Sequence, residues 1–292
     1  MKEIMAFFLF FATVLLVLLS PAFSESAEVI IIGDTHLKPV SDVISVIEQA
    51  LHHDTKTYSP AQANKKLKAL VREENARVVV VLGRDALDIA ADLTESVPVV
   101  YGLLVEPPRL RRQNETGVYL ETSINEYMSL VARSFPNIRK VGIIYGPDTE
   151  RLVRSAESPQ IRAIKARNSY EFVNALNSLN TDAFLLLPDR GLLSPTALEA
   201  VYLHSFRSRT PVFGISEKYV REGSLLSLVF DSEGMGRQLG EIVKSVLSKG
   251  SARDMPPAPP QRLNLYINTD TAKKMNITIP EELLRRAKKV YP

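Results

Sequence analysis

The stretch PVFGISEKYVREGSLLSLVFDSEGMGRQLG, residues 211–240, decides the fold of this chain. It predicts a short strand at 211–214, a connector, a second strand at 225–230 and the start of a long helix. Asp231 or Ser232 can cap that helix, whose apolar residues recur at helical spacing. Strand and helix alternate in the same way on both sides of this stretch, which predicts an α/β fold.

The two halves of the chain repeat this alternation without sharing sequence. In the first half, β-branched runs predict strands at 28–33, 77–82 and 97–104, with helices after Pro39, at 61–75 and at 85–93. In the second half, Ser123 opens a helix with Glu126 in the capping-box position. The further elements expected there are strands at 140–145, 160–166 and 183–187 and helices at 169–179 and 195–206.

The tail begins with a break in the pattern. Four prolines among residues 256–260 favour a stiff extended link, followed by a strand at 263–267 and two helices, the second with Pro280 in its first turn.

The N-terminus has the features of a secretory signal peptide. Lys2 precedes an apolar run at 4–19, and small residues follow, with cleavage expected after Ser24. The run is shorter than the roughly 20 residues of a spanning helix, and an uncleaved anchor stays open as the alternative. The chain has no cysteine, so it has no disulfide framework and no thiol for lipid attachment. These features predict a protein free in a bacterial periplasm.

Composition limits the classes of function. With 292 residues, of which 45% are hydrophobic and 24% charged, the chain is long enough for two domains with their own cores. The 36 basic and 33 acidic residues give a net charge of +3, and the basic residues are spread along the sequence. Nothing therefore favours nucleic acid as a partner.

Sites for cofactors, metals and catalysis are not indicated. Gly234, Gly236 and Gly240 lack the dinucleotide-binding spacing and fall within a predicted helix, where close helix packing explains them better. The four histidines have no metal-ligand spacing, and no G-x-S-x-G nucleophile elbow occurs. We therefore expect no cofactor, no metal and no catalytic residue.

Five segments resemble the ABC transporter substrate-binding proteins that include the binders of tryptophan and other aromatic amino acids. Their order and spacing carry the resemblance, together with the terminal Asn, Ala and Ile-Pro pattern. The segments are 83–108 (GRDALDIAADLTESVPVVYGLLVEPP), 115–148, 184–201, 211–240 and 265–290 (LYINTDTAKKMNITIPEELLRRAKKV).

The resemblance implies a type I periplasmic binding protein, with two flavodoxin-like (Rossmann-like) lobes and a solute cleft between them. Three segments are expected to cross between the lobes, near 116–122, near 230–232, and in or after the proline link. The implied division is a signal peptide at 1–24, a first lobe at 25–118 plus 232–256, and a second lobe at 119–231 plus 262–292.

Candidate ligand-binding residues follow from a general rule for open α/β sheets, in which ligands lie beyond the carboxyl ends of the strands. Residues that follow predicted strands, or lie at a predicted crossing, are therefore candidates. They are Asp34, Thr35, Gly83, Arg84, Asp85, Tyr101, Tyr145, Asp189, Arg190, Ser216, Tyr219 and Asp231.

Three of these candidates bear on the charge of the solute. The resemblance implies that Asp189 holds an ammonium group, with a structural loop aspartate as the alternative. Arg84 would bind a carboxylate bidentately or extend to solvent. Arg84 and Arg190 both depart from the family pattern, which favours an anionic or larger solute over a neutral aromatic amino acid.

The function implied is solute binding for uptake, without catalysis. We expect a monomeric periplasmic protein that binds an amino acid or related small molecule and delivers it to an ABC permease in the inner membrane. The alternative is a ligand-sensing protein that partners a membrane receptor kinase. An exported α/β enzyme is a third and weaker hypothesis.

Overall fold

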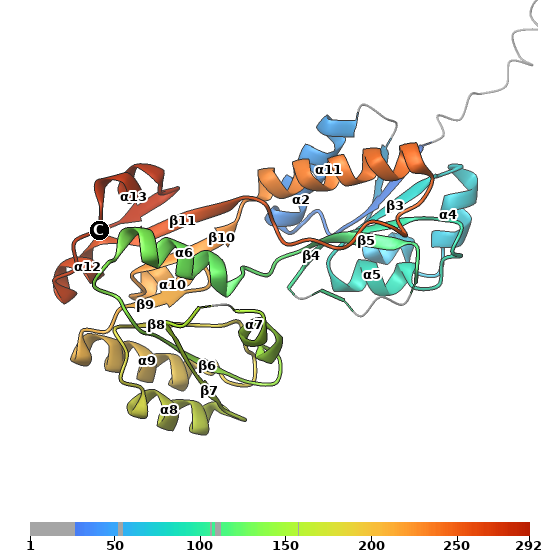
Figure 1. Cartoon of the computed structure of the whole chain (residues 1–292). Helices are drawn as coiled ribbons and strands as arrows, with labels where there is room; N and C mark the ends of the chain where they lie inside the picture. Colours follow the sequence, from blue (N-terminus) through green and yellow to red (C-terminus); the bar gives the residue numbers. More distant parts are fainter. Residues whose placement is uncertain (1–26, 52–54, 106, 109–111, 157) are drawn as a thin grey trace, which may run out of the picture.

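The computed structural model describes residues 27–51, 55–105, 107–108, 112–156 and 158–292. The expected signal peptide lies outside these residues. Two lobes, each built on its own β-sheet, are joined by three connections (Figure 1). Within the described residues, no helix combines the length and apolar character needed to cross a membrane.

The first lobe contains a five-stranded parallel sheet in the order β2-β1-β3-β4-β5. Its strands are β1 (Val29–Ile32), β2 (Thr55–Tyr58), β3 (Val78–Leu82), β4 (Val99–Leu104) and β5 (Glu115–Tyr119). Its helices are α2 (Lys38–Leu51), α3 (Pro60–Ala63), α4 (Leu67–Glu73), α5 (Arg84–Ala90) and α11 (Ser232–Lys249).

Apolar side chains cover both faces of this sheet because successive strand residues point to opposite sides. Val29 and Ile31 belong to the core under α2 and α11, whereas Ile30 and Ile32 belong to the core under α4 and α5. Helices α2 and α11 approach closely at Gly236, where an added Cβ would lie 2.6 Å from Cβ of Val46. Helix packing therefore explains this glycine, as predicted.

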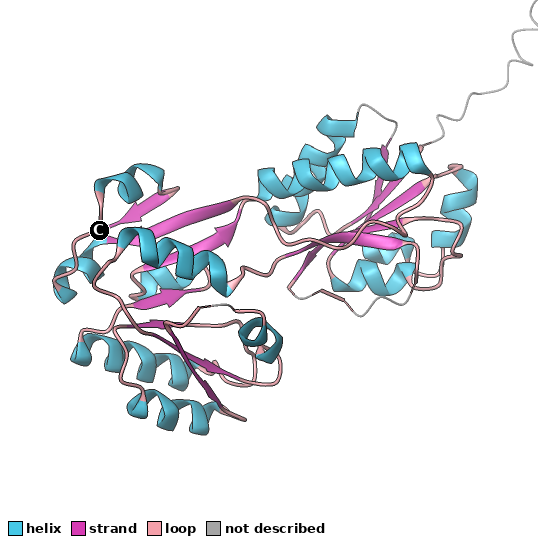
Figure 2. Cartoon of the chain, in the orientation of Figure 1, coloured by secondary structure: helices cyan, strands magenta, loops and turns pink. Residues whose placement is uncertain are grey.

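The second lobe contains a seven-stranded sheet in the order β12-β11-β10-β9-β8-β6-β7, with β11 antiparallel to β10. Helices lie on both of its faces (Figure 2). The strands are β6 (Val141–Tyr145), β7 (Ile161–Lys165), β8 (Ala183–Leu185), β9 (Val212–Gly214), β10 (Leu226–Phe230), β11 (Leu263–Asn268) and β12 (Lys289–Tyr291). The helices are α6 (Ile124–Ser134), α7 (Glu150–Arg154), α8 (Ser169–Ser178), α9 (Pro195–Ser208), α10 (Glu217–Glu222), α12 (Thr269–Met275) and α13 (Glu281–Arg286).

Three crossings connect the lobes. The first leads from β5 to α6, the second from β10 to α11, and the third from Ala258, which pairs with Val118, to β11. Asp231 caps α11, as one of the two predicted caps, by accepting a hydrogen bond from Gly234 N at 2.9 Å. Its second oxygen accepts one from Asn264 Nδ2 at 3.0 Å, so Asp231 links the second and third crossings. The exact residues at which the lobes divide stay a prediction.

The helix predicted at 61–75 is two helices in the structure. Ser59 caps α3 in a capping box with Gln62, and the helix ends within one turn. Lys65 then adopts a left-handed conformation with φ of 61°, which an α-helix does not accommodate. The chain resumes helical structure as α4.

Five elements have no counterpart in the sequence prediction: β2, β5, α7, α10 and β12. Strands β2 and β12 are short and only partly buried, so they lack an apolar run. Strand β5 opens with Glu115 and Thr116, which are polar yet buried. Helix α10 spans six residues that were assigned to a connector. Pairing with neighbouring segments stabilises these elements more than their own composition does.

Glu74 ties β2 to α4 and makes stability depend on pH. Lys56 Nζ lies 2.6 Å from Glu74 Oε2, and this hydrogen bond holds the pKa of Glu74 below its ordinary value, against the effect of burial. A lowered pKa stabilises the fold above the unfolded-state value of about 4.3, and this stabilisation is lost as the pH falls through the folded-state value.

We expect Lys56→Met to lower the free energy of unfolding by about 0.5–1.5 kcal/mol at pH 7. The difference from the wild type should shrink as the pH falls through the lowered pKa of Glu74 in the folded wild type, because Glu74 is then protonated in both proteins. Urea unfolding across this pH range measures both quantities. Lys68→Met, at an exposed position on α4, is the control, and an equal loss in both variants would contradict the assignment.

Candidate functional site

The carboxyl ends of β8, β9 and β10, together with residues of the first lobe and the first crossing, surround an apolar cavity of about 210 Å³. None of the described residues that line it carries a charged side chain. They are Val105, Leu120, Thr122, Ile124, Tyr127, Leu185, Leu186, Leu187, Pro188, Ile215, Ser216, Leu228, Val229 and Phe230. We call this cavity the apolar pocket.

Both lobes contribute to the apolar pocket. Val105, which follows β4, comes from the first lobe, and Leu120 and Thr122 belong to the first crossing. Val229 and Phe230 end β10 immediately before the second crossing. The pocket therefore lies where the lobes meet, next to two of the segments that connect them.

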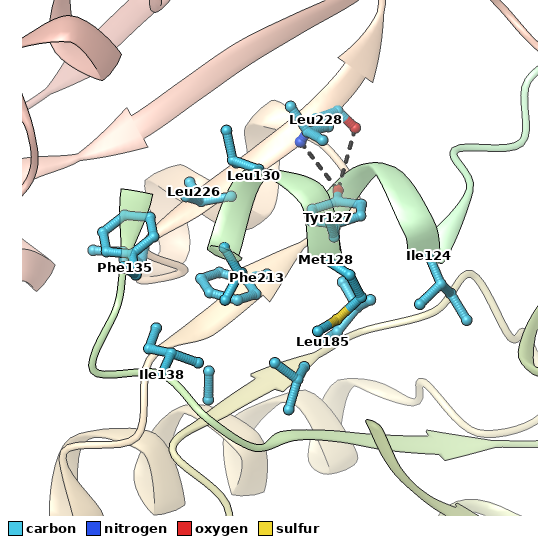
Figure 3. Close-up of a cluster of buried hydrophobic side chains, with 14 of the residues drawn as sticks. Ile124, Tyr127, Met128, Leu130, Phe135, Ile138, Leu185, Phe213, Leu226 and Leu228 are labelled. Carbon is cyan, nitrogen blue, oxygen red and sulfur yellow. Dashed lines mark hydrogen bonds between the residues drawn. The ribbon is translucent and has the colours of Figure 1, made fainter. Parts of the chain in front are cut away.

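Tyr127 of α6 lines the apolar pocket and belongs to the core cluster drawn in Figure 3. Its hydroxyl donates to Gly214 O at 2.7 Å and accepts from Leu228 N at 3.0 Å, with Leu228 O at 3.3 Å. The side chain is 3% exposed, and burial raises the pKa of Tyr127 well above its ordinary value. The hydroxyl is therefore neutral at any physiological pH.

A second and more polar cavity, of about 600 Å³, lies at the carboxyl ends of β1 and β3 in the first lobe. Asp34, Gly83, Arg84 and Asp85 line it, so the structure brings four of the predicted residues together. Asp34 Oδ1 accepts a hydrogen bond from His36 N at 3.1 Å. We call this cavity the polar pocket.

The two pockets are neighbours along β4. Leu103 lines the polar pocket and Val105, two residues later, lines the apolar pocket. Leu103 has a φ of 56°, at an irregularity in the pairing of β4 with β5 between Tyr101 and Leu104. Left-handed backbone is rare for a bulky residue and is concentrated at functional sites. This strand end therefore lies between the apolar and the polar parts of the site.

Tyr101 does not face the cleft. Its side chain is fully buried in the core under α5, and its hydroxyl has no hydrogen-bond partner within the described part of the chain. The structure corrects the expectation because alternate residues of β4 point to opposite faces and Tyr101 points inward.

Asp189 is 3% exposed and braces the loop after β8. Its Oδ2 accepts from Thr149 Oγ1 at 3.0 Å, and its Oδ1 accepts from Gly191 N at 3.0 Å and Leu192 N at 3.2 Å. This geometry favours the structural alternative, a loop aspartate, over an ammonium ligand. Arg190, the next residue, is exposed.

The other predicted residues do not gather in one place. Ser216 lines the apolar pocket, whereas Tyr219 lies on α10 and packs against the core under α8 and α9. Tyr145 ends β6 half-buried, and Asp231 sits at the crossings. Thr35 is exposed beside the polar pocket without lining it. Contact of each of these residues with a solute stays a prediction.

The sequence reasoning missed the apolar lining. It selected polar residues after predicted strands, although Leu187, Pro188, Ile215 and Phe230 occupy the same kind of position. The rule that ligands lie beyond strand ends would have found these residues had apolar side chains been included. Among the described residues, no group of three or more His, Cys, Asp or Glu could hold a metal ion.

Comparison with known proteins agrees with this geometry. The sequence model of a family described as ABC transporter substrate binding protein matches residues 45–291. The chain belongs to this family. Substrate-binding proteins of this kind bind small solutes and work with ABC permeases. The resemblance drawn from the sequence is thereby confirmed.

Relatives of this substrate-binding protein include the tyrosine-binding protein of Clostridioides difficile (strain R20291), which is 22% identical over 219 residues. The match covers 68% of this chain and 63% of that relative, so the chain spans less than two thirds of the relative's length.

Two solved structures share the fold of this substrate-binding protein. One is an ABC domain in complex with L-Trp from Streptococcus pneumonia, at 19% identity and a TM-score of 0.57. The other is a ligand-free, open substrate-binding protein with adhesive properties from Clostridium difficile, at 16% identity and a TM-score of 0.68. Each match covers 91% of this chain and 99% of the other. The predicted type I periplasmic binding fold is confirmed.

Proposed function

We propose that this chain is the periplasmic solute-binding component of an ABC-type uptake system, and that its solute is an amino acid or a related molecule with a large apolar group. The observation that carries the proposal is the apolar pocket, which lies at the junction of the lobes and whose lining, in the part of the chain that the structure describes, is uncharged. Its volume of about 210 Å³ suits one apolar group rather than a whole drug-sized ligand.

The charged end of the solute would lie in the polar pocket. Arg84 lines that pocket beside Gly83 and can pair bidentately with a carboxylate. The names of the relatives support this solute class, since one binds tyrosine and another was solved with L-Trp. Binding at the micromolar level needs roughly 8 kcal/mol, which requires both an enclosed apolar group and charge-assisted hydrogen bonds.

The remaining parts of the proposal rest on the N-terminal sequence and on the resemblance to the family. The protein is exported by a cleaved signal peptide, acts as a monomer in the periplasm, and releases its solute unchanged to a permease in the inner membrane. Nucleic acid has no part in this function.

A thermal-shift screen with amino acids, nucleosides, small organic acids and peptides tests the proposal. A solute at 100 times its dissociation constant stabilises the folded protein by about 2.7 kcal/mol. We expect L-tyrosine or L-tryptophan to raise the melting temperature. A panel in which no amino acid does so would overturn the assigned solute class.

Val105→Asp tests the apolar pocket itself. Val105 is 45% exposed and lines the pocket, so the substitution should leave the melting temperature of the free protein nearly unchanged. A bound solute would bury the new carboxylate, and we expect the affinity for L-tyrosine and L-tryptophan to fall at least tenfold in calorimetric titration. Val290→Asp is the matched control, because Val290 is 41% exposed and lies outside the pocket. Equal affinities in the two variants would contradict this site.

A further inference from the structure

Strands β9 and β10 diverge at the apolar pocket. Their parallel register consists of Leu226 beside Phe213 and Ser227 beside Gly214, and β9 ends there. Strand β10 continues through Leu228 to Phe230. Ile215 and Ser216 on one side, and Val229 and Phe230 on the other, then line the pocket. The fork between the two strand ends is thus one wall of the pocket.

A tyrosine hydroxyl sits in this fork. Tyr127 Oη bonds to the carbonyl oxygen of Gly214, the last residue of β9, and to the backbone N and O of Leu228. Leu228 is the first residue of β10 beyond its pairing with β9. Figure 3 shows the two bonds to Leu228 and the aliphatic and aromatic side chains around the ring. Without the tyrosine hydroxyl, the Gly214 carbonyl and the Leu228 amide would need hydrogen bonds from water in these apolar surroundings.

The side chain of Tyr127 is held in place by its packing in the core. Its ring stacks on Phe213 with centroids 6.5 Å apart, and Phe213 is fully buried. The ring therefore fixes the position of the hydroxyl, and the hydroxyl fixes the separation of the two strand ends.

We propose that Tyr127 is a positioning residue of the solute site: its hydroxyl bridges the diverging ends of β9 and β10 and so sets the shape of the apolar pocket. The role in solute binding rests on the proposed function, whereas the bridge itself does not. Neutrality of the hydroxyl over the physiological pH range makes the bridge independent of pH.

The bridge also reaches the second crossing. Val229 and Phe230 follow the bridged Leu228 and precede Asp231, whose carboxylate contacts Gly234 N and Asn264 Nδ2. Only two residues therefore separate the bridged backbone of Leu228 from Asp231, the residue that links two crossings. A solute that fills the apolar pocket contacts this segment directly.

Tyr127→Phe removes the hydroxyl and keeps the ring. In the ligand-free protein, we expect the Leu228 amide to exchange with solvent at least tenfold faster than in the wild type, measured by NMR below the unfolding transition. The matched control is Tyr202→Phe, which removes a hydroxyl that donates to Tyr219 O at 3.2 Å in the same lobe but outside the pocket. Unchanged exchange at Leu228 in the Tyr127 variant, or equal changes in both variants, would overturn the bridge.

The role of Tyr127 in solute binding is tested by binding measurements with L-tyrosine and L-tryptophan as probes. We expect Tyr127→Phe to weaken binding of the probe that stabilises the wild type at least tenfold, and Tyr202→Phe to leave it within twofold. A Tyr127 variant that loses thermal stability but binds with wild-type affinity would overturn the positioning role, since a purely structural tyrosine has that signature.

Two further outcomes are distinguishable. If neither probe binds the wild type, the proposed solute class fails while the exchange measurement still decides the bridge. If Tyr127→Phe does not fold, NMR of the wild type tests the bridge instead. We expect a slowly exchanging hydroxyl proton on Tyr127 with an NOE to the Leu228 amide. The absence of this signal would overturn the proposal.

Discussion

Gly117→Ala is expected to lower the free energy of unfolding by about 3 kcal/mol or more. A Cβ at position 117 would lie 2.0 Å from the backbone O of Tyr101 and 2.6 Å from its ring. Neither group can move away, because the carbonyl belongs to β4 and the ring is fully buried. Strand β5 must therefore separate from β4, which disturbs the start of the first crossing. Chemical denaturation measures the loss.

Gly191→Ala is the matched control for this substitution. A Cβ at position 191 would come no closer than 3.4 Å to Asp189 Oδ1, which is ordinary van der Waals contact. We expect its stability to stay within about 0.5 kcal/mol of the wild type. A Gly117 variant as stable as this control would mean that the edge of the first sheet is more adaptable than its packing indicates.

Asp189→Ala is expected to cost about 2–4 kcal/mol of stability in the ligand-free protein. The substitution leaves Thr149 Oγ1 and the amides of Gly191 and Leu192 without their acceptor, and the carboxylate they lose is almost fully buried. Thermal and urea unfolding without solute measure the effect.

Arg190→Ala separates the two hypotheses for this loop. Arg190 is exposed, and its removal should change stability by less than about 0.5 kcal/mol. If Asp189→Ala instead left the ligand-free protein as stable as the wild type and abolished the response to amine-bearing solutes, Asp189 would be the ammonium ligand implied by the family resemblance.

The sequence predicted the order of the main strands and helices because their signals are local. Strands β1, β3 and β4 are continuous apolar runs, and Asp231 stands one residue before a long amphipathic helix. Strand β5 was missed because Glu115 and Thr116 are buried by pairing with β4, which no local pattern encodes. The helix predicted at 61–75 is interrupted at Lys65, whose left-handed backbone conformation the composition does not reveal.

The site was predicted less completely, for a related reason. Position after a strand selected Asp34, Gly83, Arg84 and Asp85, which the structure places around one cavity. The same rule could not predict that the Asp189 carboxylate accepts hydrogen bonds within its own loop. Its position also depends on Thr149, forty positions earlier in the sequence. Tyr127 carried no signal at all, because a tyrosine on an apolar helix face resembles any other core residue.

The close packing of α2 against α11 has a consequence for the order of folding. Synthesis produces β1 to β5 first, whereas α11 ends only at Lys249, after most of the second lobe has been made. Until then Val29, Ile31 and Val43, which α11 helps to cover, face solvent or a transient partner. The first lobe is thus the earlier to be synthesised and the later to be completed, and the long-range contact between α2 and α11 should slow its folding.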